Sequence, residues 1–468
     1  MPYKSFRDYL ERLEADSDLA KVDAEVDVKY EISAICRRVC DSNGPALLFR
    51  NLKGYKMPMA KNLYATRERF AKALETSPPQ MATEWHERIT KGPIEPRIVD
   101  DGPCKANIKM KDEINLWDFP IPLLYEKDGG HYITAPLVIT KDPEDGWRNA
   151  SVYRFMVHDK KTLGIETKSY RHFFLQFKKA EAKGERFPIA IAIGVDPLTF
   201  FAAVAPFAYG VDEIAMAGAL LKEPVEMVKC STIPLEVPAT SEIVLEGEVL
   251  PNVRKSEGPL GEFTGYYGRS GEMPVVEIKA ITYRNDPIFH SCYLGQPPTE
   301  TQLLLAVPME AEIMRACPIN GLKKVHVKEG GSTFICVAQI EKTFEGQANW
   351  LGAAILGTQA GRPIKYLILV DEDIDPLEDS QVDWALATRT QPSRDATILS
   401  NMTGIHLDPS MRDDLRKLSL TSKMIIDATK PLLTPFPETP AVPRDVAKKV
   451  ESEWGSYGIE LTGKSAGI

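Results

Sequence analysis

A succession of strand-like runs in the middle of the chain constrains the fold more than any other feature. Apolar or alternating runs, typical of strands, recur between residues 132 and 305: they are residues 152–157, 189–195, 242–249 and 275–283. A helix-like stretch at residues 169–183 interrupts them and is closed by Gly184, a common residue after a helix C-terminus. Several strands with one or two inserted helices predict a barrel-like or sandwich unit here.

The flanking parts of the chain mix helical and strand-like patterns instead. Near the N-terminus, residues 5–13 and 31–40 have a helical period, and residues 46–49 form a short apolar strand. In the last third, strand-like residues 333–340 and 366–370 alternate with helix-like residues 347–356 and 380–387. Alternation of this kind is expected of a parallel sheet covered by helices.

The chain of 468 residues is too long for one hydrophobic core. We therefore predict a mixed α/β protein of three parts, with a proline-rich linker at residues 118–122. These parts are an N-terminal α/β domain (1–113), a central β domain (114–305) and a C-terminal α/β domain (306–468). The proline-rich tail at 431–443 and the helix-like residues 444–454 lack a core of their own, which predicts an arm that joins subunits of a homo-oligomer.

Charge and cysteine content exclude several classes of protein. The net charge of −9 argues against a general nucleic-acid binder. No apolar run approaches the ~20 residues of a membrane helix, and the N-terminus lacks the apolar core of a signal peptide. Seven scattered cysteines fit a reducing compartment better than a disulfide framework. We therefore predict a cytoplasmic protein.

The most distinctive local sequence runs from Ser256 to Gly268, where Glu257 and Glu262 bracket Gly-Pro-Leu-Gly. Proline suits the second position of a type I turn and glycine the fourth. Such a turn lets both carboxylates approach one point, and close carboxylates titrate apart into one acid and one base. A hairpin with two solvated glutamates would have the same local sequence, so both interpretations stay open.

Three further clusters carry polar side chains that can do chemistry. Arg154 lies between aromatic residues on a predicted strand, and an arginine there needs a carboxylate partner from the protein or a substrate. His172, preceded by Tyr170 and Arg171, stands at the front of a predicted helix. Glu213 opens a small-residue helix, where simple capping is the alternative. Oxygen and imidazole ligands of this kind suit manganese or magnesium better than a thiolate zinc site.

The order of these motifs resembles that of the UbiD family of prenylated-FMN-dependent reversible decarboxylases. The resemblance spans nearly the whole chain and rests on motifs that follow one another in this order: Asn149-x4-Arg154, His172, Glu213 in Asp-Glu-x3-Ala-Gly-Ala-Leu, Glu257-Gly-Pro-Leu-Gly-Glu262-Phe-Thr-Gly-Tyr-Tyr, the run 370–375 and the run 407–410. The glutamate motif with its Phe-Thr-Gly-Tyr-Tyr extension is specific, whereas each other motif alone is weak.

The resemblance implies a fold and a set of site residues. Family members hold the cofactor in a split β-barrel between an N-terminal α/β domain and a C-terminal α/β oligomerisation domain. By similarity, the ligands of Mn²⁺ (or Mg²⁺) would be Asn149, His172 and Glu213, with K⁺ nearby. We expect the cofactor to be bound by Asn149, Ser151, Val152, Arg171, His172 and Glu213. The catalytic network would be Arg154, Glu257 and Glu262, with Glu257 orienting the arginine and Glu262 donating the proton.

The resemblance also implies partners. These would be a conjugated carboxylic acid (aromatic, heteroaromatic or α,β-unsaturated), CO₂, a flavin prenyltransferase that supplies the cofactor, and further copies of the chain in a dimer or hexamer. His290, His406 and Tyr170 are candidates for contact with the substrate ring. The sequence departs from some members because residues 347–352 contain no lysine for the flavin phosphate. Arg171, Lys423 or the metal alone would then neutralise the phosphate.

Two other functions remain open on the sequence alone. A glycosidase-like hydrolase could use Glu257 and Glu262 as acid and base, but Asn149, His172 and Glu213 would then have no explanation as a set. A catalytically silent scaffold subunit of a multi-subunit carboxylase is the second alternative. The intact glutamate pair and Arg154 argue against it.

Overall fold

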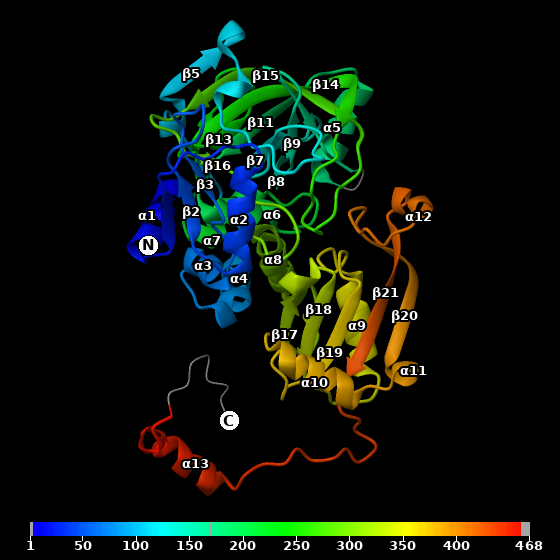
Figure 1. Ribbon diagram of the computed structural model, residues 1–468. Helices are drawn as coiled ribbons and strands as arrows, with labels where there is room; N and C mark the ends of the chain where they lie inside the picture. The colour runs from blue at the N-terminus through cyan, green and yellow to red at the C-terminus, as the bar shows by residue number, and fades with distance from the viewer. Residues whose placement is uncertain (1–2, 169–170, 460–468) are drawn as a thin grey trace.

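The structure is a computed structural model that describes residues 3–168 and 171–459. Its N-terminal part packs helices around a sheet of order β1-β2-β3-β16, in which the late strand β16 pairs with β3 (Figure 1). Ser5 starts the first helix in a capping box with Asp8. The elements are α1 (Phe6–Ala15), β1 (Leu19–Val22), α2 (Glu31–Asp41), β2 (Ala46–Phe49), β3 (Met59–Lys61), α3 (Arg67–Ala73), α4 (Met81–Thr90) and β16 (Phe289–His290).

The central part is a curved antiparallel sheet of order β6-β9-β10-β15-β14-β11-β7-β8, with β5 added to β15. The long strands β14 and β15 have bulges that increase their twist. The strands are β5 (Asn107–Met110), β6 (Tyr132–Ile133), β7 (Pro136–Lys141), β8 (Arg148–Val152), β9 (Phe155–Val157), β10 (Thr162–Ile165), β11 (Phe187–Ile193), β14 (Ile243–Glu257) and β15 (Gly271–Tyr283).

Three helices and a small sheet complete this central part. The helices are α5 (His172–Ala182), α6 (Pro197–Val204) and α7 (Glu213–Leu221). The small sheet has the order β13-β12-β4 and contains β4 (Arg97–Val99), β12 (Glu226–Lys229) and β13 (Glu236–Pro238). Strands β4 and β5 lie before residue 113 yet pair with β12 and β15, and the domain boundaries drawn from the sequence stay predictions.

Helix α8 (Glu300–Ala316) leads into the C-terminal sheet, whose order is β17-β18-β19-β21-β20. Strands β18, β19 and β21 are parallel, as the alternation in the sequence predicts, and the edge strands are antiparallel. The elements are β17 (Leu322–Val327), β18 (Ile335–Ile340), α9 (Gln347–Gly357), β19 (Tyr366–Asp371), α10 (Asp379–Arg389), α11 (Pro392–Asp395), β20 (Ala396–Thr403), α12 (Asp413–Lys417) and β21 (Leu420–Ala428). The predicted mixed α/β class is confirmed.

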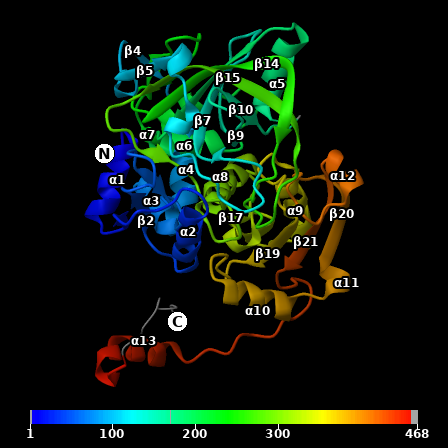
Figure 2. The same cartoon turned by 45° about the horizontal axis from the view of Figure 1, so that its top comes forward.

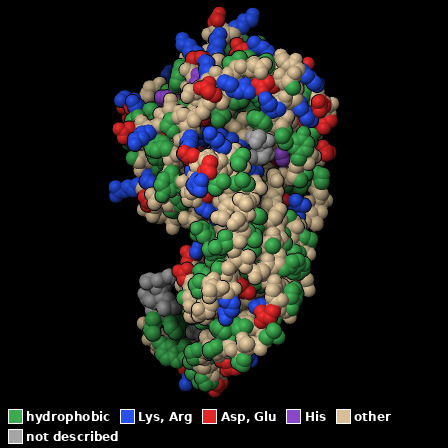
Figure 3. Space-filling model, turned by 90° about the vertical axis from the view of Figure 1, so that its right-hand side faces the viewer, with side chains coloured by type: hydrophobic (Ala, Val, Ile, Leu, Met, Phe, Trp, Pro, Cys, Tyr) green, Lys and Arg blue, Asp and Glu red, His purple; other side chains and the backbone are tan. Residues whose placement is uncertain are grey.

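The tail after β21 leaves the body as an extended segment and ends in α13 (Arg444–Ser452) (Figures 1 and 2). Its apolar side chains are exposed: Leu433 is 84% exposed and Val442 59%. In the side view of Figure 3, a hollow separates the upper body from the lower part of the molecule, where hydrophobic side chains are visible on the surface. Exposed apolar side chains on a projecting segment are typical of a contact surface.

Two local predictions are wrong. The predicted continuous strand at 152–157 is broken at Tyr153 and Arg154, between β8 and β9. The predicted type I turn after Glu257 is absent: Gly258 has a φ of +87°, the Gly258–Pro259 peptide is cis, and the Gly261 N–H donates to Asp128. In both places a tertiary contact of a charged side chain overrides the local preference.

Two further properties of the described residues bear on the sequence predictions. All seven cysteines lie in the described part and are free thiols. Among the helices of the described ranges, none is both long and apolar enough to cross a membrane.

Candidate active site

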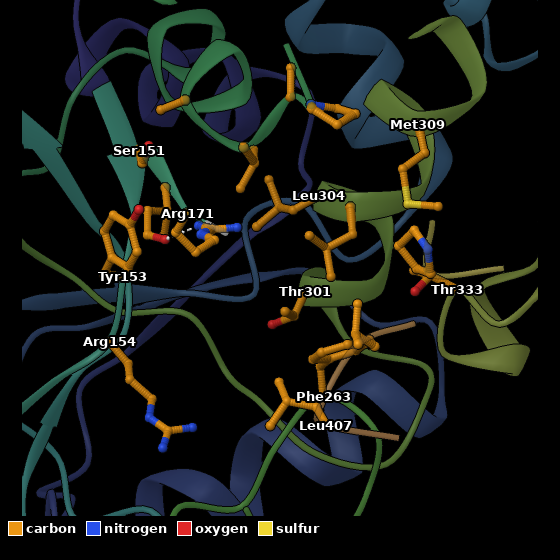
Figure 4. Close-up of a pocket in the computed structure, with 18 of the residues that line it drawn as sticks. Ser151, Tyr153, Arg154, Arg171, Phe263, Thr301, Leu304, Met309, Thr333 and Leu407 are labelled. Atoms are coloured by element: carbon orange, nitrogen blue, oxygen red, sulfur yellow. Dashed lines mark hydrogen bonds between the residues drawn. The ribbon is translucent and has the colours of Figure 1, made fainter. Parts of the chain in front are cut away.

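A cavity of about 340 Å³ lies where the central sheet, helix α8 and the C-terminal sheet meet. Its polar wall comes from β8 and the segment after it, with Ser151, Tyr153 and Arg154 (Figure 4). Its apolar wall includes Leu304 and Met309 of α8. Segments 359–363 and 405–407 of the C-terminal part close the remaining side. An apolar cavity with a few convergent polar groups is the usual form of a small-molecule site.

Arg154 joins the two glutamates of the central motif in the wall of this cavity. Its Nε and Nη2 atoms donate to the two oxygens of Glu257, each over 3.0 Å, and its Nη1 atom contacts Glu262. The side chains of Arg154, Glu257 and Glu262 are 10%, 0% and 5% exposed. Burial acts to lower the pKa of Arg154, but the charges of Glu257 and Glu166 and the hydrogen bonds to Glu257 together raise it overall.

Tyr132 lies beside this network. Its side chain is fully buried, and its hydroxyl donates to the carbonyl of Pro259 over 3.4 Å, next to Glu257. Burial raises the pKa of Tyr132, and the neighbouring charge of Glu257 raises it further. The phenol therefore stays protonated and can donate a hydrogen bond within the network.

Glu166 adds a third carboxylate near Arg154. Its carboxylate lies 3.2 Å from His406 Nε2 and 3.1 Å from Lys168 Nζ. Burial acts to raise the pKa of Glu166, but the hydrogen bond from His406 and the charge of Arg154 outweigh it and lower the pKa. Because His406 belongs to the segment that follows β20, this pair connects the central and C-terminal parts across the cavity.

At the other end of the cavity, Glu213 and His172 are the first residues of α7 and α5, and their side chains approach each other. Asp212 caps α7, and Glu213 is the first residue of this helix. The carboxylate of Glu213 points back to β8, where it accepts the Ala150 N–H over 2.8 Å. Nδ1 of His172, at the start of α5, lies 3.6 Å from Glu213. Burial raises the pKa of Glu213, and the hydrogen bond with His172 acts against it.

Asn149 completes this group from β8. It is fully buried, and its Oδ1 atom accepts the hydroxyl of Ser151 over 3.2 Å. A buried carboxylate, an amide oxygen and an imidazole form a donor set suited to Mn²⁺ or Mg²⁺. In the described part of the chain, the only ion pair of Glu213 is with His172, so the buried negative charge fits a bound cation.

Two further arginines line the cavity, and a lysine lies behind one of them. Arg171 lies 4.8 Å from the Tyr153 ring centroid and donates to the carbonyl of Val152 over 3.1 Å. Arg362 also lines the cavity. Lys423 is directed to the carbonyls of Gly361 and Arg362, and burial lowers its pKa to about 8.

The structure brings most of the predicted site residues to one cavity. Its lining includes Ser151, Val152, Arg154, Arg171, His172, Glu213, Glu262 and His406, while Asn149 and Glu257 lie directly behind it. His290 does not line it: this residue is buried among Phe6, Tyr64 and Phe200. Tyr170 lies outside the described residues. The sequence analysis missed Tyr132, Glu166 and Arg362, which belong to no motif and have no local signal.

Models of one protein family match most of the chain. The 3-octaprenyl-4-hydroxybenzoate carboxy-lyase N-terminal domain matches residues 10–89, the Rift-related domain matches residues 97–297, and the C-terminal domain matches residues 302–428. A relative from Sedimentibacter hydroxybenzoicus, named phenolic acid decarboxylase, is 37% identical over an alignment of 450 residues, and the match covers 92% of this chain and 92% of that protein.

Solved structures agree with this match. The UbiD-class enzyme HmfF from Pelotomaculum thermopropionicum, solved in complex with FMN, is 38% identical and has a TM-score of 0.86, with 96% of this chain and 99% of that chain covered. An evolved dimeric form of that enzyme in complex with prFMN is 36% identical and has a TM-score of 0.84, with 94% and 97% covered.

Proposed function

The chain belongs to the UbiD family of carboxy-lyases and is a reversible decarboxylase of aromatic acids, and on that premise we propose that a phenolic or related conjugated acid reacts beside Arg154, with prenylated FMN in the cavity. The observation that carries the proposal is Arg154, held between two buried glutamates in the cavity wall. The FMN and prFMN complexes of HmfF support the choice of cofactor. When bound, this cofactor supplies the electron sink that side chains lack.

Arg154 orients the acid. A guanidinium binds a carboxylate bidentately, and Glu257 fixes its plane through two hydrogen bonds. The apolar wall formed by Leu304 and Met309 excludes water from the ring. A desolvated carboxylate loses CO₂ more readily, because an apolar site destabilises its localised charge, and this charge is dispersed as neutral CO₂ departs.

Glu262 returns the proton. As the bond between the ring carbon and the carboxyl carbon breaks, CO₂ leaves and the proton of Glu262 forms the new C–H bond at the same ring carbon. In carboxylation the same carboxylate removes that proton. The contact with Arg154 holds Glu262 at the cavity surface, where a positioned acid can act.

Asn149, His172 and Glu213 would hold Mn²⁺ or Mg²⁺. The buried carboxylate and the adjacent imidazole support this ligand set. We propose that the metal and Arg171 together bind the cofactor phosphate, because Arg171 directly precedes His172 and lines the same cavity. Lys423 is a weaker candidate, since its amine is engaged by two backbone carbonyls. K⁺ near this site is a further prediction of the family resemblance.

The exposed tail supports a homo-oligomer, in which its apolar side chains would cover a second copy. The evolved HmfF form is dimeric, and both a dimer and a hexamer fit a projecting tail. Supply of the cofactor by a flavin prenyltransferase and a cytoplasmic location stay predictions. The hydrolase and the silent scaffold lose their support, because the family match and the decarboxylase relatives indicate a carboxy-lyase.

Coexpression with and without a flavin prenyltransferase tests the proposal. We expect the coexpressed protein to carry a flavin-like absorbance and to release CO₂ from at least one acid in a panel of hydroxybenzoic, furoic and cinnamic acids. Protein made without the prenyltransferase should be inactive. Equal CO₂ release from both preparations would exclude the prenylated cofactor, and no release from any acid by the loaded protein would exclude the proposed substrate class.

A further inference from the structure

The segment from Tyr125 to Tyr132 lies against the turn that carries the two glutamates. The Gly129 N–H donates to the carbonyl of Pro259 over 2.7 Å. A Cβ atom on Gly129 would come within 2.3 Å of the Gly258 carbonyl oxygen. The two segments are therefore in direct backbone contact, although more than a hundred residues separate them in the sequence.

Asp128 makes the polar link between the segments. Its Oδ1 atom accepts the Gly261 N–H over 2.9 Å, and its Oδ2 atom accepts the Tyr125 N–H over 2.9 Å. Burial raises the pKa of Asp128, while the two backbone N–H groups and the charge of Arg154 act to lower it. A partly buried carboxylate that binds one N–H from each segment fixes their relative position.

The residue that Asp128 holds stands immediately before Glu262. Gly261 has no room to move toward Tyr125, because a Cβ atom there would lie 2.4 Å from the Tyr125 ring. Beyond Glu262 the turn is closed by its own backbone, since the Glu262 N–H donates to the Tyr266 carbonyl over 2.9 Å. Asp128 therefore supplies the side-chain contact just before Glu262, while Gln302 binds the carbonyl of Phe263 just after it.

Glu257 is held differently. It ends strand β14, where it pairs with Gly271 of β15, and Arg154 binds both of its oxygens. None of these contacts involves Asp128. The two glutamates thus depend on different parts of the chain for their positions.

We propose that Asp128 is a positioning residue that directs Glu262 toward the reacting carbon through the Gly261 N–H. The inference rests on the proposed role of Glu262 as proton donor. Loss of Asp128 should then slow proton delivery while leaving the Arg154–Glu257 pair and carboxylate binding intact.

Asp128→Ala and Asp128→Asn in the loaded enzyme test this, with Asp159→Ala as the matched control. Asp159 also accepts two backbone N–H groups, those of Lys161 and Thr162, but in a hairpin that does not line the cavity. We expect Asp128→Ala to lower kcat by about 10- to 100-fold, because a displacement of ~1 Å can cost that much, with KM changed by less than about threefold. Asp128→Asn should recover part of kcat, since its amide oxygen can still accept the Gly261 N–H while its NH₂ group faces the Tyr125 N–H.

Hydrogen–deuterium exchange supplies a readout that does not depend on turnover. Asp128→Ala should speed exchange in peptides that contain Gly261, and Asp159→Ala only in peptides that contain Lys161 and Thr162. Full kcat in Asp128→Ala, an equal loss of kcat in Asp159→Ala, or a rise in KM that accounts for the whole loss would overturn the proposal. If the loaded wild-type enzyme releases no CO₂, the proposed function fails instead of this proposal. Unchanged exchange at Gly261 in Asp128→Ala would even then refute the contact between Asp128 and the Gly261 N–H.

Discussion

The two ends of the cavity handle buried charge in opposite ways. At the Arg154 end, one guanidinium contacts both Glu257 and Glu262, so each of these buried carboxyl groups has a cationic partner within the chain. At the Glu213 end, an equally buried carboxylate has a neutral backbone N–H and an imidazole as its described partners. An unpaired buried charge is costly. The first end therefore has its cation within the chain, whereas the second is the end where we expect a bound cation.

Removal of Arg154 should have the largest effect on the Arg154 end, because this side chain contacts both glutamates. Arg154→Ala leaves two buried carboxylates without their cation, so we expect kcat to fall by at least about 10³-fold and stability to fall by about 3 kcal/mol. Steady-state kinetics and denaturant unfolding measure the two effects.

The matched control for that variant is Arg186→Ala. Arg186 also lies between two glutamates, Glu248 and Glu277, but its side chain is 49% exposed. Its loss should change stability by about 0.5 kcal/mol or less and leave turnover unchanged. Equal destabilisation by the two variants would show that burial does not distinguish the pairs.

Glu262→Gln distinguishes the roles of the two glutamates at the Arg154 end. The amide keeps the shape but carries no transferable proton, so we expect turnover to fall by about 100-fold or more. Hydrogen exchange at the product carbon in deuterated water should stop as well. Glu257→Gln should also abolish turnover, because Arg154 then loses its bidentate partner, while retaining the bound flavin. Exchange at the wild-type rate in Glu262→Gln would assign the proton to another residue.

The contrast between the two ends also marks the limit of sequence reasoning. Helices such as α2 and α9 were predictable because their apolar periods are local, and the order of the motifs indicated the family. The break in the strand at Arg154 was not predictable, because it is caused by the contact with Glu257, which lies 103 residues further along the chain. Likewise, turn propensity favoured an internal hydrogen bond after Gly258, but Gly261 donates to Asp128 instead. Periodicity assigns a residue to a face of an element and carries no information about its partner across the fold.

His172→Ala tests the end that we expect to depend on a cation. Removal of an imidazole ligand should weaken Mn²⁺ binding by about 10- to 100-fold or more, and bound flavin should fall in parallel because the metal would contact its phosphate. Elemental analysis and flavin absorbance of the purified variant measure both. Arg154→Ala is the control, since it should keep its metal content. Full manganese in His172→Ala would remove this residue from the ligand set.

The smallest expected effect concerns the stability of the metal-free protein. Burial raises the pKa of Glu213 in the folded state, so ionisation of Glu213 opposes folding. Stability should therefore fall as pH rises from the unfolded pKa through the folded pKa. Glu213→Gln lacks this ionisation, and we expect its metal-free melting midpoint at pH 7 to exceed that of the wild type by about 2 °C.

Added Mn²⁺ should reverse that order, because the metal stabilises the state that binds it and the amide offers a weaker ligand. Glu246→Gln is the matched control: Glu246 is equally buried, but it accepts the N–H groups of Ser231 and Thr232. Glu246→Gln should lower the melting midpoint with and without metal. One carboxylate oxygen is replaced by an NH₂ group, which then faces a backbone N–H that also donates. If metal-free Glu213→Gln instead melts below the wild type, the Glu213 carboxylate is already neutralised within the chain, and the contrast between the two ends of the cavity fails.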